Sequence, residues 1–180
     1  IDVWMTEAGY DVNPGSPQRA IAIGDKSALM TQADWILRSS LLYARHGIKK
    51  VFYYQLFDDN AANPIQYGSS GLVDGLKRRP AADYIMQSSK LMGQYTYKET
   101  LSQDPIVDVY VSGAKKMYVL AIPDEKNRKG VYELILKGAK TATIYNLQAG
   151  SDAMISKNVD ISSGRLKVDV TETPVFVQGN

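Results

Sequence analysis

Two short stretches of the sequence place carboxylates directly after apolar runs. The first, "VWMTEAGYD", puts Glu7 at the end of a strand-like segment, with Gly9 close behind. The second, "VFYYQLFDDN", ends in Asp58 and Asp59. A carboxylate held at a strand end beside a pocket can act as a nucleophile or as a general base. Glu7 can equally be a solvated strand end, and the residue pattern alone leaves both interpretations open.

The groups around these carboxylates suit the binding of a sugar. Tyr10 can orient Glu7 or stack on a sugar ring. Asp58, Asp59 and Asn60 can hydrogen-bond sugar hydroxyls, hold a calcium ion, or form only a polar turn. A retaining glycosidase needs two carboxyl groups about 5–5.5 Å apart, one as nucleophile and one as acid/base. Glu7 would therefore be half of such a pair.

The first half of the chain alternates strand and helix signals. Residues 3–6 and 51–57 read as buried strands, and the helices are predicted over 27–46 and 80–92. In a parallel β/α barrel, functional groups lie at the carboxyl ends of the strands. The second strand end therefore adds Gln55 and Phe57 to the candidate substrate-binding residues.

The second half changes character near residue 97. Short apolar–polar alternations separated by turn signals predict strands and no helix, which is typical of a small antiparallel β-sandwich. We expect two domains, over residues 1–97 and 98–180. The predicted strands are 106–112, 116–122, 131–136, 141–146, 165–171 and 175–178.

Tyrosines recur along the predicted sandwich strands, and they have two interpretations. Aromatic side chains on an exposed sheet face can bind glycan, whereas packing within the sandwich is the more ordinary role and the one we favour. The tyrosines concerned are Tyr110, Tyr118, Tyr132 and Tyr145.

Composition narrows the classes of function. The chain has 180 residues, 44% of them hydrophobic, with a formal net charge of +2 and no cysteine. This charge does not predict a nucleic-acid partner, and no apolar run is long enough to span a membrane. The single histidine, His46, argues against a Ser-His-Asp triad. No zinc-ligand spacing or phosphate-binding glycine motif is present, so we expect neither a metal nor a cofactor.

The chain opens on Ile1, within what reads as a buried strand. Two β/α units cannot close a sheet around a core, and a (β/α)₈ barrel needs roughly 250 residues. We therefore expect the sequence to be the C-terminal part of a longer protein. A signal peptide would lie in the missing N-terminal part, giving an extracellular or periplasmic location.

These stretches resemble the clan A glycoside hydrolases. "VWMTEAGYD" is similar to the seventh barrel strand of that clan, where a "W-x-T-E-x-G" stretch is frequent. "VFYYQLFDDN" and "GLVDGLKRRPAADYI" resemble the eighth strand and its helix. "YVLAIPD" and "VTETPVFVQG" look like the β-sandwich that many of these enzymes carry. The resemblance implies the last two β/α units of a (β/α)₈ barrel, a sandwich after them, and Glu7 as the catalytic nucleophile.

The sequence also departs from the pattern of that clan. Ala8 follows Glu7 where a bulky residue is common, and the second strand lacks the tryptophan that often floors the sugar site. The acid/base glutamate of the clan belongs to the fourth strand, so the remainder of the barrel must supply it, and this chain alone should be inactive. We expect part of a retaining hydrolase of poly- or oligosaccharides. The alternatives are a non-catalytic glycan-binding or scaffold protein on a degenerate barrel, and a sandwich module used for attachment.

Overall fold

The computed structural model describes residues 1–161 and 163–180, which form two compact units. Unit 1 comprises Ile1–Ser89 with Ala149–Asp152, and unit 2 comprises Lys90–Gln148 with Ala153–Asn180. Unit 1 is thus divided from unit 2 after Ser89, within α2, whereas the sequence places a boundary after residue 97. The return of residues 149–152 to unit 1 was not predicted from the sequence.

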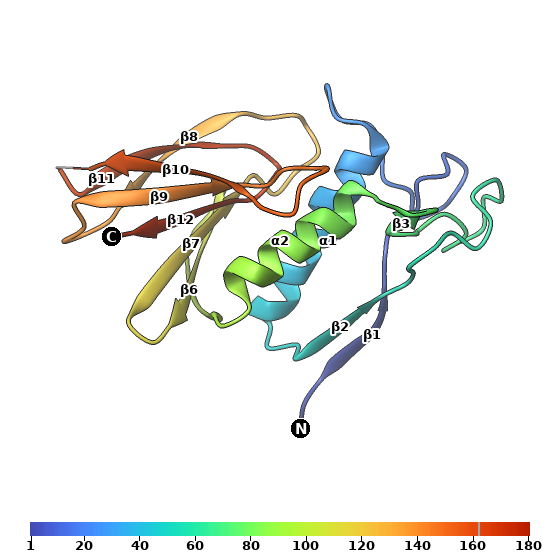
Figure 1. Cartoon of the computed structure of the whole chain (residues 1–180), viewed down its shortest axis with the longest axis horizontal. Coiled ribbons are helices and arrows are strands. Elements are labelled where there is room, and N and C mark those ends of the chain that lie inside the picture. The colour runs from blue at the N-terminus through green and yellow to red at the C-terminus, as the bar shows by residue number, and fades with distance from the viewer. Residues whose placement is uncertain (162) are drawn as a thin grey trace. The chain divides into compact units, whose positions relative to one another are not determined.

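Unit 1 contains a parallel pair of strands, two α-helices and a small hairpin (Figure 1). A loop of Gly, Pro and Ser residues connects the first strand to the first helix, and a second long loop follows the second strand. The elements are β1 (Trp4–Ala8), α1 (Ala28–Arg45), β2 (Lys50–Tyr53), β3 (Val73–Asp74), β4 (Lys77–Arg78) and α2 (Pro80–Met92).

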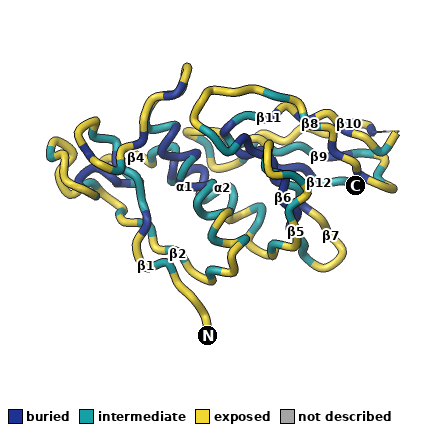
Figure 2. The backbone as a smooth tube through the Cα atoms, turned by 180° about the vertical axis from the view of Figure 1, so that it is seen from behind, coloured by how far each residue is buried: buried dark blue, intermediate teal, exposed yellow. Residues whose placement is uncertain are grey.

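Both helices occur where the sequence predicts them. Ser27 caps α1, its hydroxyl accepting the backbone N–H of Met30 at 3.3 Å. Gly47 follows the helix with a φ of +76°, a conformation that glycine adopts without steric cost. Pro80 is the first residue of α2, as its fixed φ favours. Part of α1 is buried (Figure 2), and its buried apolar residues are Ala33, Ile36 and Leu37.

Strand β2 is shorter than the apolar run 51–57 predicts. It ends at Tyr53, and the Tyr54–Gln55 peptide bond that follows is cis. The carbonyl oxygens of Gln55 and Leu56 both accept the backbone N–H of Leu72, at 3.0 Å each. The prediction of a strand through Phe57 was wrong because these carbonyls bond to the returning loop instead of to a sheet neighbour.

Unit 2 contains a six-stranded antiparallel sheet, in the order β10-β9-β12-β7-β6-β5, and a separate antiparallel pair, β11-β8. Each of the six predicted strands is present to within one residue at either end. The bounds are β5 Thr96–Gln103, β6 Ile106–Ser112, β7 Lys115–Ala121, β8 Gly130–Ile135, β9 Thr141–Asn146, β10 Ile155–Asp160, β11 Arg165–Val170 and β12 Val175–Gly179.

Strands β5 and β10 were missed by the sequence reading. They are the two edge strands of the larger sheet, and most of their residues are exposed or only partly buried. Edge strands carry polar side chains on both faces more often than central strands do, so their sequences lack a clear apolar alternation. The segments "TYKETLSQ" and "ISKNVD" show this.

The core of unit 2 lies between its two sheets. Strand β11 alternates as predicted, with Leu166, Val168 and Val170 buried and the residues between them exposed. These side chains pack with residues of the larger sheet, including Leu120 and Val177. Of the four tyrosines considered above, Tyr110 is buried and the others are partly buried, as the packing interpretation predicts.

Among the described residues, no helix has the length and apolar character needed to cross a membrane.

Candidate active site

An irregularity in the pairing of β1 with β2 determines where Glu7 points. Met5 pairs with Val51 and Ala8 with Tyr53, so three steps along β1 match two steps along β2. Ala8 is buried and Met5 is partly buried, whereas Thr6 and Glu7 between them are both exposed. A β-bulge of this kind re-aims a side chain at the end of a strand. The extra residue thus turns Glu7 onto the exposed face of the pair.

The exposed face of the strand pair is aromatic. Trp4, Phe52 and Tyr54 are 49%, 51% and 42% exposed. The rings of Trp4 and Phe52 lie 6.3 Å apart between centroids, and Lys50 Nζ lies 4.3 Å from the Trp4 ring centroid. The opposite face contacts α1, where the Tyr53 hydroxyl donates to the Ile36 carbonyl at 2.9 Å. The strand that carries the exposed Glu7 thus also carries an exposed aromatic ring.

Within the described part of the chain, Glu7 makes no hydrogen bond and no ion pair. Its carboxylate oxygens are available to react or to bind, in contrast to the buried carboxylate of Asp11 four residues later. A nucleophile must present an unshared oxygen to the substrate. The environment of Glu7 meets that requirement.

Gly9 sits where the two strand ends come closest. A Cβ atom at this position would lie 2.4 Å from the carbonyl oxygen of Tyr54, which excludes any side chain. The backbone N–H of Tyr54 donates to the Ala8 carbonyl at 2.8 Å, and the Tyr54 ring meets Tyr67 edge-on at 5.2 Å. Gly9 thus serves close backbone packing beside Glu7.

Asp11 joins the loop after β1 to the loop after β2. Its Oδ1 accepts the backbone N–H of Ser69 at 3.0 Å, and its Oδ2 accepts the backbone N–H of Tyr67 at 2.9 Å and the Ser16 hydroxyl at 2.6 Å. The Ser69 hydroxyl in turn accepts the backbone N–H of Asn13 at 2.8 Å. Asp11 is fully buried. These bonds hold both loops in one arrangement next to the strand ends.

Tyr10 does not contact Glu7. Its hydroxyl shares a 2.9 Å hydrogen bond with Ser39, and its ring meets Trp35 edge-on at 5.1 Å, so the side chain lies against α1. Its carbonyl accepts the Gln32 amide at 2.7 Å. These contacts fit a residue that fixes the loop after β1 better than one that touches substrate.

Of the candidate residues after β2, some have side chains held by hydrogen bonds and others have side chains exposed to solvent. Both Asp58 oxygens bind the guanidinium of Arg79, at 3.0 and 2.6 Å, and Oδ1 also accepts the Gly71 N–H at 2.8 Å. Gln55 donates to the Tyr67 carbonyl at 3.3 Å. Phe57 and Asp59 are exposed, and within the described chain Asp59 has no hydrogen bond. Phe57 and Asp59 are therefore the candidates whose side chains are free to contact a ligand.

Sequence reasoning missed Asp11, Ser69 and Arg79. Asp11 is the last residue of the quoted stretch "VWMTEAGYD". The neighbouring sequence does not distinguish a buried loop aspartate from a solvated one. Two partners of Asp11, Tyr67 and Ser69, lie 56 and 58 positions away in the sequence. Arg79 precedes Pro80, and only the bidentate bond to Asp58 shows its role.

Burial raises the pKa of the Tyr53 hydroxyl to about 12, with a smaller opposing effect from its hydrogen bond with Ser40. Burial also raises the pKa of Tyr43 on α1. Both hydroxyls therefore keep their protons to a higher pH than an exposed tyrosine does. In the residues that the structure describes, no group of three His, Cys, Asp or Glu side chains is placed to hold a metal ion.

The fold is similar to parts of several solved glycoside hydrolases. The chain superposes on a family 39 glycoside hydrolase from Bacteroides cellulosilyticus WH2 with a TM-score of 0.71 and 17% identity, covering 100% of this chain and 34% of that one. It also matches a GH30 endoxylanase from Clostridium papyrosolvens C71 (TM-score 0.61, 13% identity, 99% and 42% covered). A third match is GH30 xylanase C from Talaromyces cellulolyticus (TM-score 0.62, 11% identity, 99% and 40% covered).

These matches confirm, at the level of fold, the resemblance to a C-terminal portion of clan A glycoside hydrolases with an appended sandwich. The chain spans between about a third and two fifths of the structures it matches. No protein-family model matches the sequence, and no curated protein matches it.

Proposed function

We propose that this chain is part of a retaining glycoside hydrolase in which Glu7 is the nucleophile. The observation that carries the proposal is the register irregularity at the end of β1, where Glu7 is exposed and its carboxylate makes no hydrogen bond or ion pair within the described chain. In the reaction, a Glu7 oxygen attacks the anomeric carbon, the glycosidic bond breaks, and a glycosyl-enzyme forms. Water then attacks the same carbon and releases Glu7, so the configuration at that carbon is retained.

The acid/base carboxyl group would come from the N-terminal remainder of the barrel. Parallel strands are normally covered on both faces, yet Trp4 and Phe52 are about half exposed here. Barrel strands of the same protein would cover these rings and would bring the second carboxyl group about 5–5.5 Å from Glu7. In this proposal β1 and β2 are the seventh and eighth strands.

The candidate side chains would have different tasks. Phe57 and Asp59 are open at the second strand end and would contact the sugar directly. Asp58, Gln55 and Tyr10 are engaged with Arg79, Tyr67 and Ser39, and they would shape the loops that line the site. Contact of Asp58, Gln55 or Tyr10 with substrate would have to preserve the hydrogen bonds that these side chains already make.

The substrate class is a poly- or oligosaccharide, and xylan is a sensible first choice because two of the matched structures are named as xylanases. A polysaccharide is too large to cross a cell membrane, and such a substrate would favour an extracellular or periplasmic location. The alternative is a non-catalytic glycan-binding or scaffold protein on a degenerate barrel. It would bind saccharide on the same aromatic face without breaking it.

The test is hydrolysis by the complete protein of a panel of polysaccharides, with the wild type compared with Glu7→Gln. Removal of a nucleophile typically costs several orders of magnitude in kcat while an exposed Glu→Gln change barely alters stability. The matched control is Asp59→Asn, which should change KM more than kcat. Normal turnover in Glu7→Gln would refute the assignment. Saccharide binding with no turnover by the wild type would favour the alternative.

A further inference from the structure

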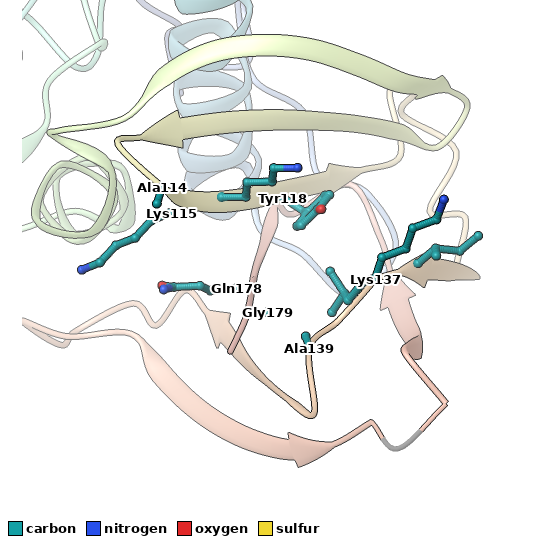
Figure 3. Close-up of a pocket in the computed structure, with 10 residues that line it drawn as sticks. Ala114, Lys115, Tyr118, Lys137, Ala139, Gln178 and Gly179 are labelled. Carbon is teal, nitrogen blue, oxygen red and sulfur yellow. The ribbon is translucent and has the colours of Figure 1, made fainter.

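Unit 2 contains a pocket of about 530 Å³ at an open end of its sandwich (Figure 3). Its walls come from the beginning of β7, the end of β8 with the turn after it, and the end of β12. The volume lies within the range of pockets that bind small ligands, roughly 300–1,000 Å³. The pocket belongs wholly to unit 2 and shares no residue with the strand ends of unit 1.

The charged side chains that line this pocket are all lysines. Lys115, Lys116 and Lys137 line it, and no aspartate or glutamate does. Within the described residues none of the three lysines forms an ion pair or a side-chain hydrogen bond. Other lysines of unit 2, such as Lys129 and Lys157, also form no ion pair within the described residues, but they do not line this pocket. Three uncompensated ammonium groups around a cavity attract an anionic ligand.

The rest of the lining combines apolar surface with unused polar groups. Ile135, Leu136 and Ala139 supply the apolar part, and the Tyr118 ring lies between the lysine-bearing walls (Figure 3). Tyr118 and the Gln178 amide make no side-chain hydrogen bond within the described chain. Burial, with a smaller contribution from Glu99, raises the pKa of Tyr118, so its hydroxyl remains a donor. Such a lining suits a ring with one apolar face and several hydroxyls.

We propose that this pocket binds a carboxylate-bearing saccharide, with uronate carboxylates paired to Lys116 and Lys137 and a sugar ring against Tyr118 and Ile135. A nucleic acid fits less well, because the lining offers one aromatic ring and no arginine. The anionic ligand is taken to be a saccharide because of the proposed function, and this part of the inference rests on that proposal. The pocket would hold an acidic polysaccharide on unit 2, whereas the proposed site of cleavage belongs to unit 1.

The binding test is isothermal titration calorimetry with the full chain and two probes, an oligogalacturonate and a xylo-oligosaccharide bearing glucuronic acid. The methyl ester of the first and the unsubstituted form of the second are the neutral controls. We expect at least one acidic probe to bind, its neutral counterpart to bind at least tenfold more weakly, and affinity to fall as salt rises. Absence of binding by both acidic probes, or equal binding of the neutral forms, would overturn the proposal.

Paired variants locate the site. Lys116→Gln with Lys137→Gln should weaken binding about tenfold, the combined effect of two charged hydrogen bonds to the ligand. Lys129→Gln with Lys157→Gln removes the same charge from exposed positions outside the pocket and should leave affinity within about twofold. Equal effects of the two pairs would mean a nonspecific charge effect and would contradict the proposal, as would full competition by equimolar inorganic phosphate.

The variant Glu7→Gln separates this inference from the proposed function. It should bind the acidic probe as the wild type does, because Glu7 belongs to unit 1 and the pocket to unit 2. If Glu7→Gln in the complete protein keeps normal hydrolysis while the lysine variants lose binding, the nucleophile assignment fails and the pocket stands. If hydrolysis is lost and no acidic probe binds, the pocket fails and the nucleophile stands.

Discussion

The buried carboxylate of Asp11 accepts the backbone N–H of Ser69 at 3.0 Å, across 58 positions of sequence. This bond links the loop that follows Glu7 to the loop that follows β2. With the second bond from Asp11 to Tyr67, it makes the two strand ends a single structural unit. The position of the candidate nucleophile therefore depends on an aspartate that takes no part in the proposed chemistry.

Replacement of Asp11 by alanine should destabilise the fold by about 3 kcal/mol, because two backbone donors and two hydroxyls lose their acceptor in a buried place. Chemical denaturation measures this change. Asp59→Ala removes an exposed carboxylate from the neighbouring loop and should alter stability by no more than about 0.5 kcal/mol. Similar small losses in both variants would show that the Asp11 network carries little stability.

Gly9→Ala should be poorly tolerated, because its methyl group would stand 2.4 Å from the Tyr54 carbonyl oxygen. Relief of this clash requires the strand ends to separate, at a cost of about 1–3 kcal/mol. Gly130→Ala is the matched control, since its Cβ would make only ordinary contacts, with Val170 at 3.5 Å and Ile122 at 4.0 Å, and its φ is not positive. Thermal unfolding should separate the two variants, and an unchanged Tm for Gly9→Ala would contradict the observed close approach.

Asp58→Asn should destabilise the loop after β2 by about 2 kcal/mol, because it leaves the largely buried guanidinium of Arg79 without its bidentate partner. Glu133→Gln breaks the exposed pair with Arg165 and should cost less than about 1 kcal/mol. Urea unfolding of both variants provides the comparison. A stable Asp58→Asn protein with a raised KM would instead point to direct contact between Asp58 and the sugar.

Stability should fall with pH above about 10 through the titration of Tyr53. Its pKa is raised to about 12 in the fold from an ordinary value near 10, so the unfolded chain loses its proton first. The stabilising effect is complete below pH 10 and is lost between pH 10 and 12, at about 1.4 kcal/mol per pH unit. Tyr53→Phe should unfold with a shallower dependence on pH in this window. An identical slope in wild type and variant would exclude the contribution of Tyr53.

Local patterns predicted most of the elements. Ser27, Gly47 and Pro80 mark helix ends through conformational preferences that act within one turn of the chain, and all three occur as expected. Leu166 and Val168 alternate with polar residues, and this local pattern likewise predicts a strand with one buried face.

The rest depends on long-range contacts that local patterns do not encode. The extra residue of β1 beside Glu7 is visible only once its register with β2 is known. The end of β2 at Tyr53 depends on bonds from Leu72 to the carbonyls that follow. The engagement of Asp58 with Arg79 likewise requires the fold of the intervening loop. The sequence predicted Glu7 as the candidate nucleophile, and the structure adds its bulge, its unbonded carboxylate and the loops beside it.

Covalent trapping of Glu7 tests the central proposal most directly. The complete protein is incubated with 2-deoxy-2-fluoro glycosyl fluorides of several sugars, which form the glycosyl-enzyme quickly and release it slowly. We predict that mass spectrometry of the digested protein finds the fluorosugar esterified to the peptide that contains Glu7, and finds none on Glu7→Gln. An active enzyme that carries the label on another residue, or that releases a product of inverted configuration, would contradict the account.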